Sequence, residues 1–145
     1  MRHLCLMIGG ERFALATKDV HEVAPAVAAR RVPGAPEWCL GLACARGTWL
    51  PLVHAAALLG LPATAATTAS RTLLMRPEGA PALLLLVDEV LEFVELDLTG
   101  SHPGLAIDDQ AWLGAVCSPG VQVLHAAALA RHPALGIVRD GTSHA

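Results

Sequence analysis

The chain has 145 residues, enough for one domain or two small subdomains, and 54% of them are apolar while 16% are charged. This balance excludes an intrinsically disordered chain, which has few apolar and many charged residues. The net charge of −3 and the aromatic content of 3% exclude a nucleic-acid groove, which needs clustered positive charge and stacking rings. The densest apolar run, residues 80–87, is far shorter than the ~20 residues of a membrane-spanning helix, so we expect no membrane insertion.

The N-terminal apolar stretch, residues 4–8, is too short for the core of a signal peptide and has no cleavage signature. Four cysteines are scattered along the chain without a tight pair, namely Cys5, Cys39, Cys44 and Cys117. We therefore expect reduced thiols and a cytoplasmic location.

Short apolar runs separated by turn residues predict β-strands along most of the chain. Gly9-Gly10 and Ala45-Arg46-Gly47 each lie between two such runs, as in β-hairpins. The strands expected in the first half are residues 3–8, 13–15, 20–23, 38–44 and 48–53. Those expected in the second half are residues 72–75, 82–87, 90–96, 112–117 and 121–124, with a loop at 99–109 and a hairpin turn at 118–120.

Two short helices are expected, at residues 54–59 and 125–132. Gly60 follows the first as a C-terminal glycine, and Pro133 is interpreted as the stop of the second. The polar residues 139–145 are expected to form a flexible tail.

Two short segments occur twice and in the same order, which indicates an internal repeat. Val20-His21-Glu22-Val23 is similar to Val87-Asp88-Glu89-Val90, and residues 53–58 are similar to residues 124–129. Each half therefore has about five strands and one short helix. Because closure removes exposed sheet edges, we expect a mainly β fold of two fused five-stranded barrels. The expected single domain spans 1–138, with subdomains at about 1–62 and 70–135 between which strands could be exchanged.

No sequence motif for catalysis, metal or a phosphate-bearing cofactor is present, and we expect neither cofactor nor metal. Cys39 and Cys44 are five residues apart without a histidine at zinc spacing. An enzymatic alternative stays open, in which His54 or His125 acts as general base beside the thiol of Cys44 or Cys117. The parallel positions of the two histidines in the repeat favour a shared structural role, such as closing the start of a helix.

Two charged residues could either simply face solvent or have a functional role. Arg46 lies in a tight turn, where its planar guanidinium could face solvent or bind a carboxylate of a partner. Glu22 interrupts an apolar strand, where it could simply point outward or contact a partner.

The residues of this chain resemble a known family. This family includes CheW, the bacterial chemotaxis coupling protein, and the related regulatory domain of the CheA histidine kinase. The resemblance covers about residues 4–131. The segments that carry it are Ile8-Gly9, Arg12-Phe13-Ala14-Leu15, Val20-His21-Glu22-Val23, Arg31-Val32-Pro33 with Pro36, Gly41-Leu42-Ala43-Cys44-Ala45-Arg46-Gly47, Leu50-Pro51-Leu52-Val53, Val87-Asp88-Glu89-Val90 and Leu113-Gly114-Ala115-Val116.

The resemblance implies two fused SH3-like five-stranded β-barrels with short helices and a non-enzymatic adaptor or scaffold in chemotaxis signal transduction. Its expected partners are the cytoplasmic tip of a methyl-accepting chemoreceptor and the regulatory domain of a CheA-type histidine kinase, at membrane-associated receptor arrays. The positions carried over as partner-contacting are Val20, Glu22, Arg46 and Gly47.

The sequence also departs from the family pattern. Cys44-Ala45 stands in place of the motif's Asn-Leu, and His54-Ala55-Ala56 in place of the usual Asp-Leu-Arg. These changes remove polar groups from a surface that the family uses. They leave open an alternative, an adaptor of a chemosensory system for type IV pili and twitching motility. The thiol hydrolase is the remote third alternative.

Overall fold

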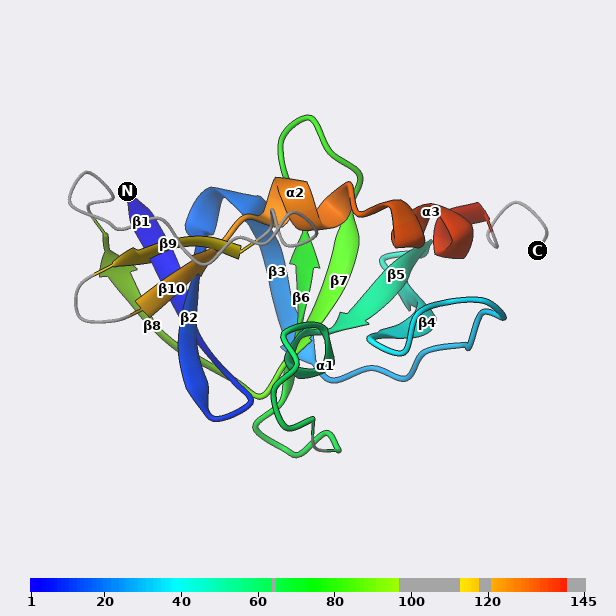
Figure 1. The fold of residues 1–145 in the computed structure, drawn as a ribbon, viewed down its shortest axis with the longest axis horizontal. Coiled ribbons are helices and arrows are strands. Elements are labelled where there is room, and N and C mark those ends of the chain that lie inside the picture. Colours follow the sequence, from blue (N-terminus) through cyan, green and yellow to red (C-terminus); the bar gives the residue numbers. More distant parts are fainter. Residues whose placement is uncertain (64, 97–112, 118–120, 141–145) are drawn as a thin grey trace.

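The structure is a computed structural model that describes residues 1–63, 65–96, 113–117 and 121–140 (Figure 1). Over these residues the chain forms strands and short helices, with one 3-10 turn (η1, Thr17–Asp19). The strands are β1 (Arg2–Ile8), β2 (Glu11–Ala16), β3 (Val20–Pro25), β4 (Cys39–Ala45), β5 (Thr48–His54), β6 (Arg71–Met75), β7 (Leu83–Val87), β8 (Glu89–Glu95), β9 (Leu113–Cys117) and β10 (Val121–Leu124). The α-helices are α1 (Ala55–Leu58), α2 (Ala126–Ala130) and α3 (Pro133–Asp140).

Each strand expected from the apolar pattern is present, with ends that differ by a few residues. Trp112, the expected loop at 99–109 and the expected turn at 118–120 lie outside the described residues. The structure therefore confirms the prediction of a mainly β fold.

The strands form two five-stranded sheets that exchange segments between the halves of the chain (Figure 1). The first sheet has the order β8-β1-β2-β10-β9, and the second has the order β3-β6-β7-β5-β4. Replacing each strand by its counterpart in the repeat (β1 by β6, β2 by β7, and so on) converts one order into the other. Each sheet combines two strands of one half with three of the other, so strands are exchanged between the expected subdomains at about 1–62 and 70–135.

Side chains alternate between the two faces of a strand, and the central strand β7 is buried on both faces. On β7, Leu83, Leu85 and Val87 pack into a central core that also contains residues of the first sheet. Leu84 and Leu86 pack into a separate cluster of the second sheet. The sheets thus share one core, and the second sheet also encloses apolar side chains of its own.

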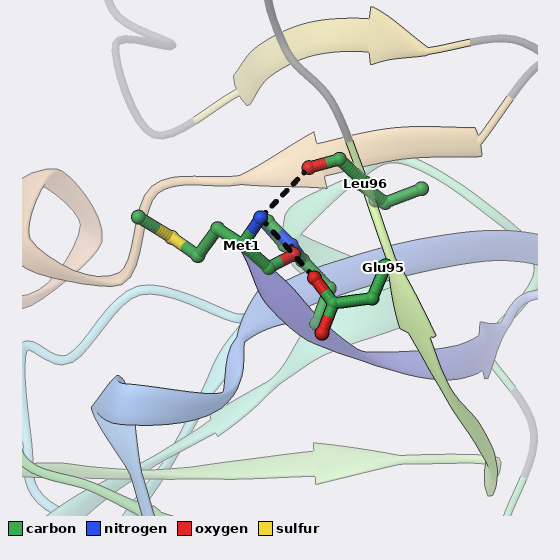
Figure 2. A network of polar contacts seen from close by, with 4 residues as sticks. Met1, Glu95 and Leu96 are labelled. Atoms are coloured by element: carbon green, nitrogen blue, oxygen red, sulfur yellow. Dashed lines mark hydrogen bonds and ion pairs between the residues drawn. The ribbon is translucent and has the colours of Figure 1, made fainter.

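Strand β8 is joined to β1 by an antiparallel ladder and by contacts at its end. The amino group of Met1 donates a hydrogen bond of 3.1 Å to the carbonyl oxygen of Leu96 and lies 3.4 Å from a carboxylate oxygen of Glu95 (Figure 2). These contacts hold a strand of the second half against the first strand of the chain.

Helix α1 ends in a left-handed glycine, as expected. Gly60 has a φ of +70°, and the amides of Gly60 and Leu61 donate hydrogen bonds to the carbonyls of Ala57 and Ala56. This is the Schellman arrangement, which satisfies the last carbonyls of a helix.

His54 and His125 occupy equivalent positions, immediately before α1 and α2, but the expected role in closing the helix start is wrong. Both residues have extended backbone, and neither side chain makes a capping hydrogen bond. The shared position follows from the repeat and not from capping.

The end of the chain differs most from expectation, because Pro133 begins a helix instead of ending one. Proline is tolerated in the first turn of a helix, where its missing N–H has no intrahelical partner to lose. Helix α3 packs on β4 and β5, and its Leu135 and Val138 are fully buried. Arg139, placed in the expected tail, is helical and donates to the carbonyls of Ala130 and Ala82; residues 141–145 lie outside the described residues.

Among the helices that the structure describes, none has the length and apolar character to cross a membrane.

Candidate functional site: the seam of the second sheet

The hairpin between β4 and β5 is built on a two-residue turn, Arg46-Gly47. Ala45 and Thr48 are the last paired residues, and Arg46 and Gly47 have φ values of +49° and +80°. Positive φ at both central residues is the type I′ geometry, whose twist matches that of the strands it joins. The turn therefore holds the Arg46 backbone in one orientation at the end of the hairpin.

The guanidinium of Arg46 binds the carboxylate of Glu22 through two hydrogen bonds. Nε donates to Oε2 at 2.8 Å and Nη2 donates to Oε1 at 2.9 Å. This is the parallel two-bond geometry in which arginine recognises a carboxylate. The pair stays open to solvent, with 65% of the Arg46 side chain and 35% of the Glu22 side chain exposed.

The ion pair shifts the titration of both groups. The hydrogen bonds from Arg46 hold the pKa of the Glu22 carboxyl below its ordinary value of 4.5. The same contacts raise the pKa of the Arg46 guanidinium. Both groups are therefore charged at neutral pH.

The structure brings together three of the four predicted contact residues. Glu22, Arg46 and Gly47 lie at one end of the second sheet. Val20 is half-buried and packs against the central core, and the ladder between β3 and β6 shifts register between Val20 and Glu22. Because such a shift turns following side chains to the other face, Val20 lies apart from the ion pair.

Glu22 and Arg46 bridge the two edges of the second sheet, β3 and β4. Further along, the segment after β3 returns to β4, where Arg30 and Leu42 exchange backbone hydrogen bonds of 2.7 and 2.8 Å. We call the space between β3 and β4, closed at these two points, the seam.

Gly41, the first residue of the motif at residues 41–47, makes the backbone contact between Arg30 and Leu42 possible. Its φ is +123°, and a Cβ atom there would lie 1.9 Å from the carbonyl oxygen of Arg30. A side chain at position 41 would therefore push Arg30 away from β4.

A cavity of about 230 Å³ opens in the seam. Sequence reasoning singled out four of its lining residues: Glu22 and Arg46 as contact residues, and Cys44 and Ala45 as departures from the family motif. The lining residues that it missed belong to β3, β6 and β7 and to the segment after β3, and they are Ala24, Val27, Thr72, Leu74 and Leu84. From sequence alone, apolar residues in strands are interpreted as core. No pattern therefore indicated that these residues line a cavity.

Of the pairs that the enzymatic alternative names, Cys44 with His54 is not arranged for catalysis. Cys44 is exposed, whereas Cys5 and Cys39 are buried. Cys44 pairs with Trp49, and His54 lies five residues further along β5, about 16 Å away at the rise of a strand. Burial raises the pKa of the Cys39 thiol, which opposes its reactivity.

Across the residues described, no three His, Cys, Asp or Glu side chains are grouped so that they could hold a metal ion. The features of the seam are the Glu22–Arg46 ion pair and the cavity of about 230 Å³ beside it.

Comparisons with known proteins show the family and the fold of this chain. A profile of the CheW-like domain matches residues 2–134. The chain belongs to the CheW-like domain family. The crystal structure of the scaffolding protein TtCheW from Thermoanaerobacter tengcongensis is similar, with a TM-score of 0.74 and 22% sequence identity over 85% of this chain and 87% of that chain. A comparison with curated protein sequences found no match.

The CheW-like fold confirms the predicted fold class, two fused five-stranded SH3-like barrels with short helices. In this CheW-like domain the second sheet is one barrel, and the seam is where its edge strands meet. The motif residues Gly41, Arg46 and Gly47 all lie at the seam. Gly41 allows the backbone contact with Arg30, and Arg46-Gly47 form the turn that carries the ion pair.

Proposed function

We propose that this protein is a non-enzymatic adaptor that links the cytoplasmic tip of a chemoreceptor to the regulatory domain of a CheA-type histidine kinase. Membership of the CheW-like domain family supports a scaffold in chemotaxis signalling. Such an adaptor acts in the cytoplasm at receptor arrays.

The observation that carries the contact site is the exposed ion pair of Glu22 and Arg46 with apolar side chains near it. Val27, which lines the cavity, is 39% exposed, and Trp49 on β5 is 48% exposed. Protein interfaces combine aromatic and apolar groups with arginine anchors at their centre. We assign partner contact to Glu22, Arg46 and Gly47 at the seam, and to Val20 on the adjoining part of β3.

The test measures binding of the purified protein to a CheA regulatory domain and to a receptor-tip fragment by titration calorimetry. Arg46→Ala should weaken binding to at least one partner about thirtyfold, the loss expected for an anchoring arginine. The matched control is Arg12→Ala, because Arg12 also forms an exposed ion pair, with Glu92 on the first sheet. Parental affinity of Arg46→Ala for both partners would reject this contact site.

The pathway is decided by which kinase binds. Tight binding to the kinase of a pilus-linked system, and not to a chemotaxis kinase, would favour the twitching-motility alternative.

The enzymatic alternative has its own test, thiol labelling at neutral pH. A catalytic thiol labels much faster than an ordinary exposed cysteine because it is present as thiolate. We expect Cys44 to label at the rate of a simple exposed thiol, and Cys5 and Cys39 to label on unfolding.

A further inference from the structure

We draw no further inference here: the strongest candidate, the cavity of about 400 Å³ between η1, the end of β10 and the start of α2, has both acidic and basic side chains in its lining, and nothing in the described structure shows which ligand would fill it.

Discussion

The guanidinium of Arg46 donates two hydrogen bonds to the carboxylate of Glu22, which lies 24 residues earlier in the chain. The two residues therefore act on the surface as one unit with a fixed geometry. Sequence patterns had presented them as two separate contact residues. The pair joins the edge strands of the second sheet and leaves both side chains partly open to a partner.

Because the two side chains form a unit, their effects on binding should not add. Glu22→Ala and Arg46→Ala should weaken partner binding by similar factors, and the double variant should bind no worse than either one. Each variant should shift the Tm by no more than about 3 °C, since exposed ion pairs contribute little to folding. The measurements are calorimetric affinities and thermal melting of all four proteins. Additive losses would show that each residue contacts the partner independently.

The lowered pKa of Glu22 predicts a pH dependence of stability with a definite sign. The folded carboxyl titrates below its ordinary value of 4.5, so the native state binds fewer protons than the unfolded state in that range. The stabilisation is complete above the ordinary value and is lost as the pH falls through the lowered pKa. Urea unfolding from pH 7 to pH 2 should show a stability gap between the parent and Glu22→Gln that closes on the acid side. A gap that is unchanged at pH 2 would contradict this linkage.

Gly41 should be the least replaceable glycine of the hairpin. Gly41→Ala should lower the free energy of unfolding by about 3 kcal/mol or more, because the new Cβ meets the Arg30 carbonyl and the backbone is strained. Gly47 also has positive φ but has open space around it, and Gly47→Ala should cost only about 1–2 kcal/mol. Chemical denaturation measures both. Equal losses would mean that Arg30 is not held against β4 as described.

Helix α3 should be part of the folded core. Leu135 is fully buried and Ile137, two residues later, is 55% exposed. Leu135→Ala should therefore cost about 2–5 kcal/mol, whereas Ile137→Ala should change stability by no more than about 0.5 kcal/mol. Denaturant unfolding of the two variants gives the comparison. A mild effect of Leu135→Ala would contradict the packing of α3 on β4 and β5.

The sequence by itself determined the local structure of this protein. Alternation of apolar residues located the strands, and Arg46-Gly47 identified the tight turn between β4 and β5. The repeat also indicated two equivalent five-stranded units. These features depend on neighbours within a few residues, so they can be read without knowing which strands pair.

Tertiary structure decided which strands share a sheet and what the motif residues do. The alternating residue pattern of strands such as β3 and β8 fits either sheet equally well. Packing of the whole chain therefore decides which sheet each strand joins. The exchange of strands between the halves brings Thr72 on β6 into the lining of the cavity beside the Glu22–Arg46 pair. Sequence analysis missed α3 because a proline can mark either the end of one helix or the start of the next. Burial of Leu135 and Val138 selects the start of a helix at this position. Contacts between residues far apart in the chain carry no local pattern, and for this reason the fold could be predicted and the seam could not.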